Sequence, residues 1–224
     1  MILNVHMIIQ DNLCHKIDYL FIEEGTQKQI ALATYNLNEY ATLYFEGNKI
    51  EVTTKPKIVE KSKYEFKYPL SSKCKKTVGF PVLFNGKQEY VYYPEAAKCN
   101  NNRFFRKNMA YTVFCNETDI KLLFKVGFKN ENSHHYCMYD GNKLVAVISR
   151  YSYSENNCKA TIYVEDDANL LMAMIACTEE IIAVPRPEQD GVGDPSAGYY
   201  VSIPESHQFY DHEFVERVKR RYNL

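Results

Sequence analysis

The amino-acid sequence predicts a mainly β fold, in which a closed antiparallel β-barrel surrounds one central hydrophobic helix. Its 224 residues fit one domain with a substantial core. The aromatic residues are 19 Tyr and 12 Phe, side chains that suit the half-buried surfaces of a sheet. Across residues 1–126, short alternating apolar runs are separated by turn residues, and no long stretch has a clean helical period. The one clear helix comes later in the chain.

Most of the predicted strands lie in this first part of the chain. The run at 41–52 contains the turn residues Glu46, Gly47 and Asn48, so it is expected to fold back on itself. Asn85-Gly86 is the strongest hairpin signal, because both residues accept the positive φ that a type I′ turn requires. The predicted strands are 2–9, 16–24, 29–35, two within 41–52, 64–70, two within 79–93, and 110–115.

A further apolar run at 119–128 precedes a predicted meander of three strands, at 134–139, 143–151 and 158–164. Asp140-Gly141 separates the first two strands of the meander, and polar residues at 155–157 separate the last two.

A helix is predicted at about 167–183, where Asp166 or Asp167 can cap its first turn and Pro185 stops it. Its stretch "LLMAMIAC" is apolar at every position, so all of its faces must be buried. The apolar stretch is too short to span a membrane. A sheet that curls around the helix would bury it from every side.

The predicted domain organisation is one barrel at 1–184 and a C-terminal segment at 185–224 that packs on the same domain. This segment contains a Pro- and Gly-rich loop, a possible strand at 199–204 and a short C-terminal helix. Phe214, Val215, Val218 and Tyr222 share one side of that helix, so we expect it to cover the outside of the barrel.

The segment 139–181 resembles the last strands and the helix of the tubby C-terminal-like superfamily, which includes phospholipid scramblases, LURP-one-related proteins and small bacterial relatives. The matching stretches are "GNKLVAVISR", "CKATIYVEDD" and "ANLLMAMIACTEEI", in that order. The resemblance implies a closed barrel of about twelve strands threaded by the helix. The lipid-binding basic residues of tubby and the calcium-binding segment of the scramblases have no residue-by-residue match in this chain.

Composition and cysteine usage predict a cytoplasmic protein with no transmembrane segment, and a peripheral location at a membrane is an option that the prediction leaves open. The formal net charge is −1, and a near-neutral chain without a binding motif predicts no nucleic-acid partner. The seven Cys are odd in number and lack CxxC spacing, which favours reduced, buried thiols over a disulfide framework. The oligomeric state stays open.

The sequence contains none of the common catalytic or nucleotide-binding motifs, such as GxSxG, GxxxxGK[ST] or GxGxxG. We therefore expect no catalytic residues, no cofactor and no metal. His134, His135 and Cys137 form the densest metal-capable cluster. A structural zinc site needs paired ligands on two chain segments, and only one such segment is present, so we expect exposed imidazoles beside a turn instead. In a strand, His135 and Cys137 would share a face while His134 points away. The alternative hypothesis is an enzyme or metal site at the barrel mouth around these three residues.

The region 55–76 is rich in lysine, with eight Lys against two Glu. Such a run is typical of a solvated edge strand, which lysines protect from aggregation, but it can also bind anions. The candidate lipid- or anion-binding residues are Lys73, Lys75, Lys76, Arg103, Arg106 and Lys107. The predicted function is a non-catalytic binding module for anionic phospholipid headgroups at a membrane surface or for a protein partner.

Overall fold

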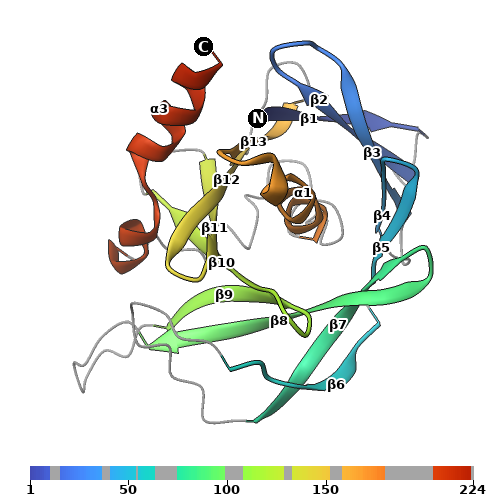
Figure 1. Cartoon of the computed structure of the whole chain (residues 1–224), viewed down its shortest axis with the longest axis vertical. Helices are drawn as coiled ribbons and strands as arrows, with labels where there is room; N and C mark the ends of the chain where they lie inside the picture. Colours follow the sequence, from blue (N-terminus) through green and yellow to red (C-terminus); the bar gives the residue numbers. More distant parts are fainter. Residues whose placement is uncertain are drawn as a thin grey trace, which may run out of the picture.

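Thirteen antiparallel strands form a single sheet that curls into a ring (Figure 1). The computed structural model describes residues 1–10, 16–36, 41–53, 55–63, 75–98, 108–128, 133–151, 158–179 and 204–222. The predicted strand at 64–70 lies outside these residues, as does most of the possible strand at 199–204. The strands are β1 (Ile2–Ile9), β2 (Lys16–Glu23), β3 (Gln29–Asn36), β4 (Ala41–Phe45), β5 (Asn48–Val52), β6 (Lys57–Glu60), β7 (Lys76–Phe84), β8 (Lys87–Lys98), β9 (Asn108–Cys115), β10 (Ile120–Gly127), β11 (Ser133–Asp140), β12 (Lys143–Tyr151) and β13 (Cys158–Val164).

Pairing between β5 and β7 closes the ring. The strand order runs from β5 back to β1, then from β13 down to β7, and Val52 of β5 is paired with Val82 of β7. Twelve strands therefore form a closed barrel, and β6 lies outside it as an edge strand on β7. The predicted closed antiparallel barrel is confirmed, and the lysine-rich run does contribute an edge strand.

The hairpin turns have the backbone conformations that their sequences predict. Asn85 and Gly86 have φ values of 48° and 84°, as a type I′ turn between β7 and β8 requires. Glu46 and Gly47, at 48° and 77°, make the corresponding turn between β4 and β5. These tight turns bring consecutive strands together as neighbours and so build each half of the barrel from local pairs.

The hydrophobic helix lies inside the ring of strands (Figure 1). A 3-10 turn, η2 (Asp167–Asn169), leads into α1 (Leu170–Cys177). The carboxylate of Asp166 caps this turn by accepting a hydrogen bond of 3.0 Å from the backbone N–H of Ala168. Residues 180–183 of the predicted helix lie outside the described part of the chain.

Helix α1 and the inward-facing strand residues form one hydrophobic core. Five consecutive residues of α1, from Ala173 to Cys177, have no exposed surface. They pack with inward-facing side chains such as Phe21, Leu43 and Ile162, which come from three different strands. All residues of α1 except the half-buried Leu171 are therefore buried, close to what its apolar sequence predicts.

A second layer covers part of the outside of the barrel. It consists of η4 (Pro204–Phe209) and α3 (His212–Arg221), the helix drawn in red in Figure 1. Phe209, Phe214 and Val218 pack against outward-facing residues of β9 to β13, including Phe124. The amphipathic pattern therefore identified the buried face of α3 through Phe214, Val215 and Val218, whereas Tyr222, just after the helix, is exposed.

Candidate functional site

The predicted basic residues that the structure describes are Lys75 and Lys76, and both are exposed where β7 begins. The other four, Lys73, Arg103, Arg106 and Lys107, lie outside the described residues. Within the described lysine-rich region, Lys57 donates to the side chain of Gln88 and Lys61 forms an ion pair with Glu95. These two lysines therefore help to hold β6 on the barrel.

The outer surface of β6 and β7 carries an exposed apolar pair. Ile58 is 70% exposed and Val78 is 45% exposed, and the two residues are directly paired across the strands. Adjacent to them, Glu60 is paired with Lys76 on the same face. We define the β6–β7 face by exposed Ile58, Glu60, Lys76 and Val78, which share one side of the two strands. Lys75, which is also exposed, directly precedes β7.

The histidine cluster is arranged differently from the sequence-based expectation. His135 and Cys137 share a face of β11, as predicted, but His135 is 7% exposed and Cys137 is fully buried, so the expectation of exposed imidazoles is wrong for His135. The ring of His135 hydrogen-bonds Ser149 at 2.9 Å and packs against Tyr210, which precedes α3. Across the described ranges, no group of three or more His, Cys, Asp or Glu side chains is placed to hold a metal ion.

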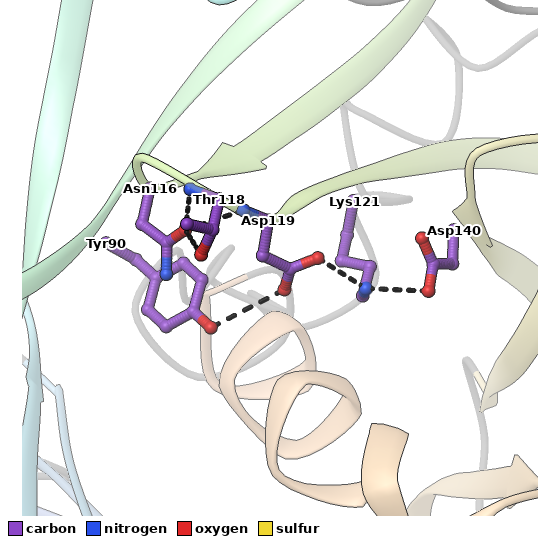
Figure 2. A network of polar contacts seen from close by, with 6 residues as sticks. All are labelled: Tyr90, Asn116, Thr118, Asp119, Lys121 and Asp140. Atoms are coloured by element: carbon purple, nitrogen blue, oxygen red, sulfur yellow. Dashed lines mark hydrogen bonds and ion pairs between the residues drawn. The ribbon is translucent and has the colours of Figure 1, made fainter.

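A polar network lies at the end of the barrel where α1 begins, which we call the mouth (Figure 2). The Asn116 side-chain oxygen accepts the backbone N–H groups of Thr118 and Asp119, at 2.9 and 2.7 Å. This local turn, typical of Asn, fixes the position of Asp119 just before β10. The hydroxyl of Tyr90, from β8, points to the Asp119 carboxylate at 3.5 Å.

Lys121 is the charged centre of this network. Its ammonium group contacts Asp119 at 2.5 Å and Asp140 at 2.9 Å, while its side chain is 8% exposed. Lys121 and Asp140 are cross-strand neighbours on β10 and β11, so the barrel register itself creates their ion pair. The lysine is thus neutralised from two sides.

Both Lys121 and Tyr90 retain their protons at neutral pH. Burial alone would lower the pKa of Lys121, but hydrogen bonds and negative charge from Asp119 and Asp140 outweigh it and raise the pKa. Burial, together with the charge of Asp119, raises the pKa of Tyr90. The two side chains therefore act as hydrogen-bond donors, and this arrangement suits binding better than proton abstraction.

Sequence reasoning missed the mouth residues because Tyr90, Asp119, Lys121 and Asp140 come from separate parts of the chain. One available signal was a lysine at the second position of an otherwise apolar strand, "IKLLFKVG", with an aspartate immediately before it. A lysine in such a strand must either reach solvent or find a carboxylate.

Burial of thiol and phenol groups makes the fold sensitive to alkaline pH. Burial raises the pKa values of Cys137, Cys177 and Tyr90. Since these pKa values are higher in the folded than in the unfolded state, the folded protein keeps protons that the unfolded chain releases. The contribution of the two thiols to stability is complete below about pH 8.5 and is lost as pH rises, by about 1.4 kcal/mol per pH unit for each thiol, whereas that of Tyr90 is lost only above the ordinary tyrosine pKa of about 10.

We expect the urea midpoint to fall progressively above about pH 8.5, and to fall less steeply in Cys137→Ala than in the unsubstituted protein. Urea unfolding at a series of pH values measures both slopes. A midpoint that stays constant up to about pH 10.5 would contradict the prediction.

Within the described ranges, no helix is long and apolar enough to cross a membrane. Comparison of the chain with protein-family models, with curated proteins and with solved structures finds no match.

Proposed function

We propose that this protein is a non-catalytic module that binds anionic phospholipid headgroups at a membrane surface through its β6–β7 face. The observation that carries the proposal is the exposed pair Ile58 and Val78 beside exposed lysines. Single exposed apolar residues are ordinary on soluble proteins, whereas an adjacent apolar pair beside lysines is the composition that interfacial binding uses.

The energetics require both kinds of residue. Insertion of Ile58 and Val78 into the interfacial region would remove apolar surface from water, at about 25 cal/mol per Å². Each lysine near an anionic surface adds about 1 kcal/mol. Lys75 and Lys76 together would therefore supply about 2 kcal/mol, and the attraction weakens as salt screens it.

The same fold also favours a place for the chain in the tubby C-terminal-like superfamily. The support is a twelve-strand closed barrel around α1, which follows the last strand of a meander as in the resemblance. The proposed membrane binding depends on the β6–β7 face and not on membership of this superfamily.

Cosedimentation with vesicles tests the proposal. We expect binding to vesicles of phosphatidylcholine with phosphatidylserine, stronger at about 50 mM than at about 150 mM salt, and no binding to phosphatidylcholine alone. Replacing Lys75 and Lys76 by Glu should weaken binding by about 30-fold or more, the equivalent of about 2 kcal/mol. Ile58→Ser should weaken it at both salt concentrations, because the apolar contribution is not screened.

A matched control makes the same charge change elsewhere. Lys16 and Lys28 are exposed at the start of β2 and in the turn that follows it, and β3, β4 and β5 separate β2 from β7 in the sheet. Lys16→Glu with Lys28→Glu should therefore lower vesicle binding far less than the pair at 75 and 76. Equal losses would indicate a response to total charge, and an absence of binding at either salt would reject the lipid proposal in favour of a protein partner.

A further inference from the structure

The barrel mouth contains a pocket of about 500 Å³ beside the first turn of α1. This volume falls in the range of small-molecule sites, which are about 300–1,000 Å³. The pocket borders the network of Figure 2, and Tyr90, Asp119 and Lys121 belong to both. No residue of the β6–β7 face lines it, so a ligand in this pocket would not depend on membrane binding.

Four amide side chains from different parts of the fold line this pocket. Asn48 begins β5, Asn85 lies in the β7–β8 turn, Asn116 precedes β10 and Asn169 precedes α1. A side-chain amide has two N–H donors and two acceptor lone pairs, so an amide that already bonds within the protein can keep a further position for a hydroxyl group. Several amides around one pocket thus favour a ligand with several hydroxyl groups.

Three of these amides already make hydrogen bonds within the protein: Asn116 accepts two backbone N–H groups, and the side chains of Asn48 and Asn85 bond to each other. The Asn85 side chain donates to the Asn48 side-chain oxygen at 3.0 Å and accepts the backbone N–H of Lys49 at 2.9 Å. Asn169 occupies the N-cap position of α1, yet its side chain makes no capping hydrogen bond. Its amide is therefore not committed to the helix and lies on the wall of the pocket.

The charges at the mouth are largely balanced. Lys121 lies between Asp119 and Asp140, and Glu89 forms an ion pair with Lys87 at 3.1 Å. An anion would meet a lysine that already has two carboxylates, and a cation would compete with that lysine for them. A neutral ligand avoids both costs, because it needs hydrogen bonds without charge compensation.

Apolar groups complete the lining. The rings of Phe84 and Tyr90 lie with centroids 6.2 Å apart, and Leu171 and Met172 of α1 also border the pocket. A sugar or cyclic polyol has apolar C–H faces as well as hydroxyl groups, so it can contact aromatic and aliphatic side chains while its hydroxyls bind amides. We propose that the barrel mouth binds a neutral polyhydroxylated ligand of monosaccharide size.

Ligand-observed saturation-transfer NMR on the full chain tests this site. The probes are glucose, mannose, galactose, N-acetylglucosamine and myo-inositol, with inorganic phosphate and choline as charged comparisons. We expect saturable binding of at least one neutral probe and weaker or no binding of the two ions. Asn169→Ala and Tyr90→Phe should each weaken the bound probe about fivefold, the effect of one lost hydrogen bond.

The matched control is Asn142→Ala, the same truncation at an exposed turn outside this pocket, which should leave the affinity unchanged. Circular dichroism of each variant verifies that it is folded. The proposal is overturned if none of the neutral probes binds, if phosphate or choline binds more tightly than all of them, or if a bound probe is unaffected by both pocket variants.

Discussion

Met174→Lys is expected to prevent this protein from folding. Met174 lies in α1 with no exposed surface, and its neighbours are the apolar side chains that line the barrel. A lysine there would place an ammonium group in the core without a carboxylate partner, at a cost of several kcal/mol. Such a cost is a large part of the 5–15 kcal/mol that stabilises a typical domain.

Soluble yield and far-UV circular dichroism measure the outcome. Two controls separate the position from the chemistry. Met174→Leu nearly conserves volume and should cost less than about 1.5 kcal/mol. Ile58→Lys introduces the same charge at a residue that is 70% exposed and should fold normally. A soluble Met174→Lys variant with a cooperative thermal transition would show that α1 is not enclosed by the strands.

Phe209→Ala is expected to loosen the C-terminal layer from the barrel and to lower the free energy of unfolding by about 3–5 kcal/mol. The Phe209 ring stacks on Phe124 of β10, with centroids 4.2 Å apart and planes 9° from parallel. The Phe209 backbone oxygen also accepts the hydroxyl of Tyr139 at 3.0 Å. Loss of the ring would leave a cavity over the outer faces of β10 and β11.

Urea denaturation measures this loss. Tyr222→Ala removes another aromatic ring from the same C-terminal segment, but at a residue that is 36% exposed, and should cost clearly less. If Phe209→Ala cost no more than Tyr222→Ala, the stacking on Phe124 would not contribute to stability in solution, and the C-terminal layer would not be a part of the folding unit.

Local patterns in the sequence predicted most of the elements. Alternation of apolar and polar residues placed β1 to β3 and the β11–β13 meander within one or two residues of their observed bounds. Asn85-Gly86 predicted its hairpin, because the turn type depends on two residues alone. The apolar helix indicated an enclosing sheet, since a helix whose residues are all apolar must be buried on all sides, and this composition is visible in the sequence.

The candidate sites were less accessible to this reasoning. Lys75 and Lys76 were predicted as surface residues, and both are exposed. The exposure of Ile58 was not predicted, because the sequence of β6 does not show which of its faces another element will cover. His135 was expected to be exposed, and it is buried because Tyr210, far away in the sequence, packs against it. The family membership suggested by segment 139–181 stays a prediction.

The sequence by itself determined where strands, turns and the hydrophobic helix form, because these depend on residues within a few positions of one another. The tertiary structure decided which distant strands meet. Pairing of β5 with β7 closes the barrel and leaves β6 outside, and the register of β10 with β11 places Lys121 opposite Asp140. Neither the β5–β7 pairing nor the β10–β11 register can be predicted from a local pattern, because strand partners and registers are selected by the burial of the whole core.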